Sequence, residues 1–186
     1  MKITVFASGT GTNFEALVKS EIGPKIALVI CDKAGAKVLD KASKLGVPAF
    51  LFRPQDYPSK ADFETAILAE LRANDVEWIV LAGYMRLIGE TLLLSYPNHI
   101  INLHPSLLPK YPGKDAILQA LSDGAHETGV TAHFVDAGMD TGPVIASESI
   151  PIEPHETEET LTAKIHEIEH IFYPKVVKKL VEGKLK

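Results

Sequence analysis

Cysteine and long apolar runs are scarce in this chain of 186 residues, and acidic residues outnumber basic ones. The single cysteine, Cys31, excludes an intrachain disulfide and a zinc site built on several cysteines, and it fits a reducing compartment. The longest stretch without a charged or strongly polar side chain, 78–85, is far shorter than the roughly 20 residues of a membrane span. A strand-like run that begins at Lys2 is also unlike a signal peptide. We therefore expect a cytoplasmic protein without a membrane partner.

The charge balance disfavours nucleic acid as a partner. Lys and Arg number 19 against 24 Asp and Glu, so the formal net charge is −5 and the pI is about 5.8. Proteins that bind DNA or RNA nonspecifically usually carry a basic excess, although a local basic patch stays open. The hydrophobic share of 46% and the length together predict one globular domain over residues 1–186.

Short apolar runs alternate with helical patterns along the chain. The apolar runs lack in–out alternation, which is typical of strands buried on both faces of a parallel sheet, and they cover 3–8, 26–31, 47–52, 78–82 and 100–103. Helical spacing covers 13–19, 36–45, 61–73 and 87–94, and a long closing helix over 157–181 has Pro174 as a potential break. Runs at 130–136 and 142–152 predict antiparallel additions at one edge. The pattern predicts an α/β fold with a Rossmann-like, doubly wound, mostly parallel sheet and antiparallel additions near the C-terminal half.

A glycine-rich loop, SGTGTN at 8–13, lies where the first strand meets the first helix. Such a loop lets the backbone approach a ligand, and the free amides at the helix start favour an anion. Thr12 and Glu15 have the spacing of a capping box. The dinucleotide pattern G-x-G-x-x-G fails at its third glycine, which is Phe14, and no Walker-type lysine follows. The loop predicts a site for a phosphate or another anion, with a plain helix cap as the alternative.

Asn102 and His104 lie at the end of a predicted strand, where ligands bind in open α/β sheets. Residues two apart on a strand point to the same face. An amide donor beside a titratable imidazole suits the stabilisation of an oxyanion and the movement of a proton. The alternative is a pair of turn residues that bond the backbone. A rigid stretch with three prolines follows at 104–113, and a glycine-rich loop at 136–143 carries Asp136 and Asp140.

Five strings, in order along residues 1 to about 180, give the chain its resemblance to a known family. They are SGTGTNF at 8–14, LAGYMR at 81–86, NLHPSLLP at 102–109, GMDTGP at 138–143 and EHIFYP at 169–174. Together they resemble the phosphoribosylglycinamide formyltransferases, the folate-dependent formyltransferases of purine synthesis. The third string with a later Asp marks the wider group that uses 10-formyltetrahydrofolate, and the first string points to the branch that acts on glycinamide ribonucleotide.

The resemblance implies the formyltransferase fold and direct transfer of a formyl group from 10-formyltetrahydrofolate to the amine of 5-phosphoribosylglycinamide in de novo purine biosynthesis, with no metal. It implies that the residue matching Asn102 binds the formyl oxygen and that the one matching His104 transfers protons. The residue matching Asp140 holds that histidine and favours its charged form, so that Asn102 and His104 stabilise a tetrahedral intermediate.

The positions that match acceptor-binding residues are Gly11, Thr12, Asn13, Gly83 and Glu169. The positions that match the folate site are Lys60, Met85, Arg86, Leu87, Ile88 and Asn102. The family commonly has Arg at the position of Lys60. Lys offers a ligand a compact point charge in place of the bidentate fork of Arg.

Other functions stay open as alternatives. A methionyl-tRNA formyltransferase would need a further C-terminal domain and a basic surface, and a formyltetrahydrofolate hydrolase would carry an N-terminal regulatory domain. A folate- or nucleotide-binding module has no need to keep Asn102, His104 and Asp140 together. An NAD-dependent oxidoreductase is disfavoured by the missing third glycine, although Asp32 near the end of the second strand counts weakly for it.

The sequence gives less information on the location of two further histidines and on the oligomeric state. His133 is expected either in the site or in the core, and His166 on the surface. The oligomeric state is open, a homodimer included.

Overall fold

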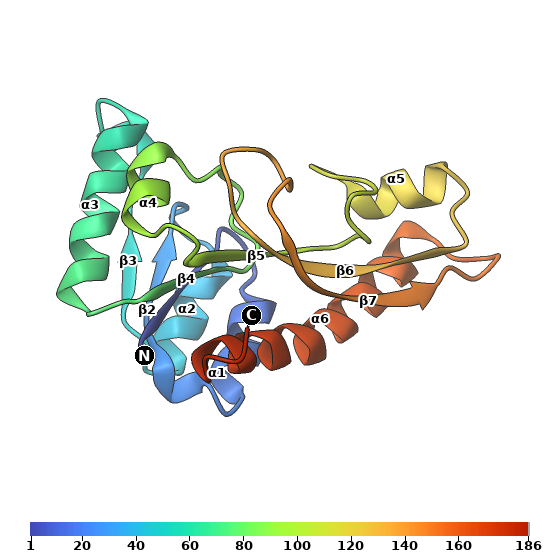
Figure 1. Cartoon of the computed structure of the whole chain (residues 1–186), viewed down its shortest axis with the longest axis horizontal. Helices are drawn as coiled ribbons and strands as arrows, with labels where there is room; N and C mark the ends of the chain where they lie inside the picture. Colours follow the sequence, from blue (N-terminus) through green and yellow to red (C-terminus); the bar gives the residue numbers. More distant parts are fainter. Residues whose placement is uncertain (186) are drawn as a thin grey trace.

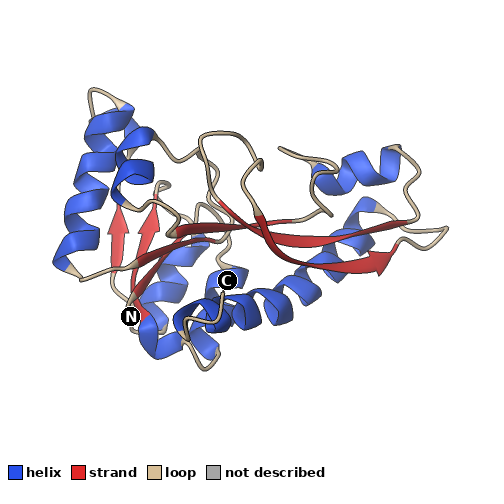
Figure 2. Cartoon of the chain, in the orientation of Figure 1, coloured by secondary structure: helices blue, strands red, loops and turns tan. Residues whose placement is uncertain are grey.

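The computed structural model describes residues 1–185 and centres on one seven-stranded sheet with helices on both faces (Figures 1 and 2). The strands are β1 (Ile3–Phe6), β2 (Ile26–Cys31), β3 (Ala49–Leu51), β4 (Trp78–Leu81), β5 (Ile100–His104), β6 (Glu127–Phe134) and β7 (Val144–Pro151). The α-helices are α1 (Thr12–Lys19), α2 (Lys37–Lys44), α3 (Lys60–Ala73), α4 (Glu90–Ser95), α5 (Ala116–Ser122) and α6 (Glu158–Val181). Short 3-10 helices lie at Gly23–Lys25 and Pro54–Asp56.

The strand order, β3-β2-β1-β4-β5-β6-β7, places the point of reversal between β1 and β4. The first five strands in this order are parallel, so their carboxyl ends share one edge of the sheet. In doubly wound sheets, ligands bind outside the carboxyl ends of the strands at such a reversal. The predicted Rossmann-like fold class is therefore confirmed, and the sheet directs attention to the loops that follow β1, β4 and β5.

Successive residues of the parallel strands enter two different cores. On β1, Ile3 and Val5 pack on the side of α1, α2 and α6, whereas Phe6 packs on the side of α3 and α4. Because helices cover both faces of the sheet, the parallel strands carry apolar side chains on both faces, which explains the missing in–out alternation.

The C-terminal half adds an antiparallel edge. β6 pairs antiparallel with β5, and β7 pairs antiparallel with β6, as the sequence predicts. In the register, Asn102 lies opposite His133, and His104 lies opposite Thr131. This pairing carries His133 to the position beside Asn102.

Several helix predictions need correction. α4 begins at Glu90 and not at residue 87, because the amide of Gly89 donates to the buried carboxylate of Glu64 at 2.6 Å and residues 85–88 form a loop. α5 was not predicted. α6 runs through Pro174 unbroken.

The continuity of α6 has a packing reason. Pro174 removes one helical hydrogen bond, but its neighbours Tyr173, Val176 and Val177 are buried in the core. The Tyr173 hydroxyl also donates to the carbonyl oxygen of Leu81 on β4 at 2.7 Å. Among the helices of residues 1–185, none combines the length and the apolar character that crossing a membrane requires.

Candidate active site

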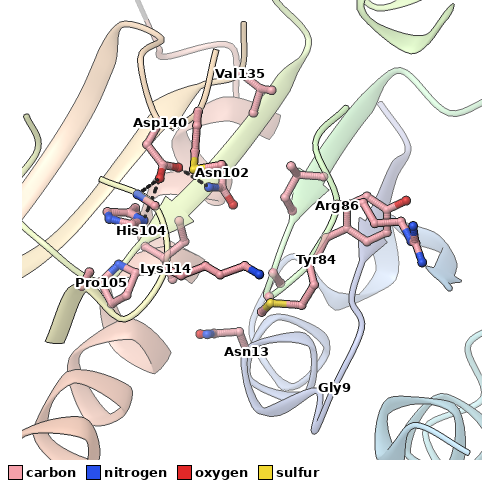
Figure 3. Close-up of a pocket in the computed structure, with 18 of the residues that line it drawn as sticks. Gly9, Asn13, Tyr84, Arg86, Asn102, His104, Pro105, Lys114, Val135 and Asp140 are labelled. Carbon is pink, nitrogen blue, oxygen red and sulfur yellow. Dashed lines mark hydrogen bonds and ion pairs between the residues drawn. The ribbon is translucent and has the colours of Figure 1, made fainter. Parts of the chain in front are cut away.

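A cavity of about 730 Å³ lies at the shared carboxyl edge of β1, β4 and β5 (Figure 3). Four segments form its walls: the loop into α1, the loop after β4, the end of β5 with the loop before α5, and the loop between β6 and β7. One turn of α6, with His166 and Glu169, completes the wall beside α1.

The loop into α1 approaches the cavity with its backbone. Gly11 is the N-cap of α1, with φ of 70° in the left-handed region, so the predicted capping box of Thr12 and Glu15 is wrong. Thr12 is already the first helical residue, and Glu15 instead forms ion pairs with Lys19 and Lys41. Those lysines lower the pKa of Glu15 to about 2. The amides at the start of α1 therefore have no side-chain cap, and Gly11, Thr12 and Asn13 line the cavity.

Gly11 is required by packing as well as by its backbone conformation. A Cβ on Gly11 would lie 2.7 Å from the Cβ of Val38, whereas a Cβ on Gly9 would meet nothing within 4 Å. We expect Gly11→Ala to lower the free energy of unfolding by about 2–4 kcal/mol, through left-handed strain and overpacking. Gly9→Ala in the same loop is the matched control and should change it by less than about 0.5 kcal/mol. Equal denaturant midpoints for the two variants would contradict this account of the loop.

His104 is held between a backbone carbonyl and a carboxylate. Its Nε2 lies 2.8 Å from the carbonyl oxygen of Tyr111, and its Nδ1 lies 3.4 Å from Oδ2 of Asp140. A carbonyl only accepts hydrogen bonds, so Nε2 carries a proton and donates it. Both ring nitrogens thus face oxygen acceptors, and the ring is 5% exposed. The carbonyl and the carboxylate together fix the orientation of the ring.

The loop that presents the Tyr111 carbonyl is fixed to β6. The hydroxyl of Thr131 donates to the carbonyl oxygen of Ser106 at 2.7 Å and accepts from the amide of Leu108 at 3.1 Å. The Ser106 hydroxyl donates to the carbonyl of Lys110 at 2.6 Å. Thr131 and Ser106 are fully buried, so these bonds are shielded from water. The contact to His104 is therefore preformed.

Asn102 and His133 complete the group around Asp140. The Asn102 Nδ2 lies 3.3 Å from His133 Nε2 and 3.5 Å from Asp140 Oδ1, and His133 Nε2 lies 3.5 Å from the same Oδ1. The His133 Nδ1 faces the carbonyl oxygen of Phe134 at 2.8 Å. Figure 3 shows the amide nitrogen of Asn102 turned to Asp140 and its oxygen turned to the cavity. The amide contacts are long, hence weak and available for exchange with a ligand.

Asp140 is the centre of this group. It has φ of 56°, and its Oδ2 accepts from the amide of Gly113 at 2.8 Å. Burial alone would raise the pKa of Asp140, but His133, the Gly113 amide and His104 outweigh burial and hold the pKa below its ordinary value. Tyr111 and Asp115 nearby also have positive φ, so three of the five such non-glycine residues in 1–185 border the site. Backbone strain of this kind concentrates at functional sites.

Glu169 lies on the α6 wall of the cavity. It is 6% exposed, and its Oε2 accepts a hydrogen bond from the side-chain amide of Asn13 at 2.9 Å. Burial raises the pKa of Glu169, although the Asn13 bond and His166 act in the opposite direction. This pair joins the start of α1 to α6 across 156 residues of sequence.

The raised pKa of Glu169 predicts a pH-dependent cost to stability. Above its ordinary pKa of 4.5 the unfolded state loses the proton more readily than the folded state, so folding becomes less favourable as the pH rises. We therefore expect Glu169→Gln to raise Tm at pH 7, with the gain shrinking toward pH 4. The exposed neighbour Glu167, changed to Gln, should show no such trend. A gain for Glu169→Gln that does not vary between pH 4 and 7 would contradict the argument.

The segment after β4 forms the opposite wall. Met85, Arg86, Leu87 and Ile88 all line the cavity, and the amide of Met85 donates to the hydroxyl of Ser8 at 3.0 Å. Arg86 Nε bonds Asp32 Oδ2 at 2.7 Å. Asp32, at the end of β2, is thus engaged by an arginine, which removes the argument for a ribose-binding acid of a dinucleotide site.

The structure brings most of the predicted site residues to this one cavity. Its walls include Gly11, Thr12, Asn13, Gly83, Met85, Arg86, Leu87, Ile88, Asn102, His104, Asp140 and Glu169. Lys60 is the exception, because it is the exposed first residue of α3, beside Glu64 and Gly89, and does not line the cavity. The expectation that Lys60 helps to hold an anionic ligand therefore stays a prediction.

Sequence reasoning missed several contributors to the site. The Tyr111 carbonyl and the Gly113 amide are backbone groups, which leave no signal in residue type. His166 was expected on the surface, but it also lines the cavity, and its position three residues before Glu169 on one helix face could have indicated this. Within residues 1–185, no group of three or more His, Cys, Asp or Glu side chains is arranged to hold a metal ion.

Comparison with known proteins gives a consistent family. A family model described as formyl transferase matches residues 1–177. Phosphoribosylglycinamide formyltransferase of Bacillus subtilis is 51% identical over 184 residues, which cover 97% of this chain and 94% of that protein. The trifunctional purine biosynthetic protein adenosine-3 of Drosophila melanogaster is 37% identical over 188 residues, which cover 98% of this chain but 14% of that protein.

Solved structures agree with the sequence relatives. Glycinamide ribonucleotide transformylase 1 from Geobacillus kaustophilus has a TM-score of 0.92 at 55% identity, covering 96% of this chain and 97% of that one. Phosphoribosylglycinamide formyltransferase from Bacillus halodurans has a TM-score of 0.93 at 46% identity, covering 97% of this chain and 95% of that one.

Proposed function

The chain belongs to the formyl transferase family, and from that premise we propose that it transfers the formyl group of 10-formyltetrahydrofolate to the amine of 5-phosphoribosylglycinamide in de novo purine biosynthesis. The observation that carries the proposal is the 51% identity to a phosphoribosylglycinamide formyltransferase over nearly the full length of both chains. The cavity supports it, because an imidazole, a carboxylate and an amide converge beside a glycine-rich helix start.

Each substrate is assigned to one wall. The acceptor lies along the α1 side, with its phosphate on the amides at the start of α1 and its ribose near Glu169. Gly11, Thr12 and Asn13 are assigned to this side, and Gly83 joins them because its carbonyl oxygen accepts from the Ser8 amide at 3.1 Å. The folate donor lies against the segment Met85, Arg86, Leu87 and Ile88, of which Met85 and Leu87 are strongly exposed and offer apolar surface for a flat ring. The two walls meet at Asn102 and His104, where the formyl group is placed.

The reaction is a direct acyl transfer. The acceptor amine forms a bond to the formyl carbon while the formyl oxygen takes up negative charge. The bond from that carbon to N10 then breaks, N10 gains a proton and the attacking nitrogen loses one. The products are a formamide and tetrahydrofolate, and no protein nucleophile is needed.

His104 and Asn102 stabilise the tetrahedral intermediate in this scheme. A protonated His104 beside the Asp140 carboxylate lowers the energy of the charged oxygen. Its Nε2 proton is held by the Tyr111 carbonyl, so the proton for N10 comes from Nδ1, which lies 3.4 Å from Asp140 Oδ2. Asn102 turns its amide from the long contacts with His133 and Asp140 and donates to the same oxygen. Asp140 remains ionised because its pKa is held below the ordinary value, so it keeps the imidazolium in place.

The proposal is tested by the acceptor dependence of tetrahydrofolate release. Purified protein is mixed with 10-formyltetrahydrofolate, with and without glycinamide ribonucleotide, and release is followed by absorbance. We expect release only with the ribonucleotide present. Release without it would identify a hydrolase, and binding of folate without any release would identify a binding module.

A further inference from the structure

The cavity wall is poor in positive charge for a site that is to hold anions. Four carboxylates line it, from Asp115, Asp136, Asp140 and Glu169. Among the described residues that line it, only Arg86 and Lys114 carry a lysine or arginine cation. A phosphate carries up to two negative charges and requires compensation in such surroundings.

Arg86 already forms an ion pair with Asp32. Its Nε donates a hydrogen bond to Oδ2 of Asp32 at 2.7 Å. The Asp32 side chain is only 7% exposed, so this ion pair is partly shielded from water. The neighbouring carboxylate cancels most of the charge that Arg86 would offer a ligand.

Lys114 is the lining cation whose charge is not neutralised by an ion pair within residues 1–185. It forms an ion pair with no carboxylate in residues 1–185. Figure 3 shows its amino group pointing into the cavity, in the space between Asn102 and Asn13. This ammonium therefore faces the open volume and not a protein partner.

The backbone of Lys114 is fixed on both sides. The preceding residue, Gly113, donates its amide to Asp140 at 2.8 Å, and the Lys114 carbonyl accepts from the side chain of Gln119 at 2.6 Å. The backbone from which the Lys114 side chain extends is thus hydrogen-bonded to the carboxylate of Asp140 and to α5. A side chain that extends from a fixed base loses less conformational entropy when it binds a ligand.

We propose that Lys114 binds the phosphate of the acceptor, opposite the amides at the start of α1. This assignment rests on the proposed function and extends its binding site to a residue on the far wall. The ammonium supplies the charge, and the α1 amides supply directional hydrogen bonds. The acceptor is a better partner than the donor, because the Lys114 amino group points into the space between Asn102 and Asn13, and Asn13 lies on the acceptor side of the cavity (Figure 3).

The test measures binding of ribose 5-phosphate by calorimetry, without turnover. The variants are Lys114→Gln, Lys114→Arg and the control Lys110→Gln, an exposed lysine that does not line the cavity. We expect Lys114→Gln to weaken binding by about 10- to 100-fold, as for the loss of one charge-assisted bond. Lys114→Arg should stay within about threefold of the wild type, and Lys110→Gln should match it.

Steady-state kinetics separates this role from two others. Lys114→Gln should raise KM for glycinamide ribonucleotide and leave KM for 10-formyltetrahydrofolate and kcat nearly unchanged. A fall in kcat alone, a rise only in the donor KM, or equal ribose 5-phosphate affinity in all four proteins would overturn the proposal. Failure of the proposed function would instead appear as absence of formyl transfer in the wild type, whatever the affinities.

Discussion

We expect His104→Gln to lower kcat by about 1,000-fold and to change the affinity for glycinamide ribonucleotide by less than about threefold, since a positioned acid or base contributes roughly 10² to 10⁴. Glutamine keeps an N–H donor of similar reach, so the bond to the Tyr111 carbonyl at 2.8 Å has a replacement. What glutamine lacks is a group that titrates and passes a proton. The loss should therefore fall on the chemical step and not on binding.

The measurement combines kcat from the acceptor-dependent assay with calorimetric binding of the ribonucleotide. His155→Gln is the matched control, because His155 is exposed and outside the cavity. Its kcat should equal that of the wild type. A His104→Gln enzyme that retains more than about a tenth of wild-type kcat would remove His104 from the proton transfer.

Asp140→Asn should lower kcat by about 100-fold or more, because the charge that stabilises the His104 imidazolium is lost. The substitution is nearly isosteric, and asparagine tolerates the left-handed backbone that Asp140 adopts at φ of 56°. The Gly113 amide can still find an oxygen acceptor at this position. The fold should therefore survive, and the effect can be read as one of charge.

The same variant has a pH signature in stability. The folded-state pKa of Asp140 lies below its ordinary value of 3.8, so ionisation stabilises the fold above that pH. This contribution is lost as the pH falls through the folded-state pKa. Thermal unfolding should show the wild type more stable than Asp140→Asn at pH 7, with the gap closing below about pH 4. A gap that is unchanged at pH 3, or full kcat across the pH range, would contradict the role given to Asp140.

The parallel half of the fold was predictable because its sequence rules are local. Apolar runs without alternation indicated strands buried on both faces, and β2 was predicted with its observed bounds, Ile26–Cys31. α5 was missed because it is short and its N-cap, Asp115, has a left-handed backbone and makes no side-chain cap. The start of α4 was missed because a distant group, the Glu64 carboxylate, binds the Gly89 amide. Such a long-range bond leaves no periodicity in the sequence.

The part of the site that was predictable consists of side chains that belong to recognisable sequence motifs. Asn102 and His104 were indicated by their place at a strand end, and Asp140 by the resemblance. The contact between them depends on the antiparallel register that sets Asn102 opposite His133 and on the strained loop that aims Asp140. Lys60 lies outside the cavity, and its role toward an anionic ligand stays a prediction, because a match in sequence does not fix where a side chain points.

We expect the formyl carbon to pass directly from the donor to the acceptor amine in this cavity. A single-turnover experiment with excess enzyme and 10-formyltetrahydrofolate labelled with ¹³C in the formyl group follows that carbon by NMR. We expect the donor signal to be replaced by the signal of the formamide of the ribonucleotide, with no free formate. Label that appears as formate, or that stays on the donor while the ribonucleotide is bound, would rule out this transfer.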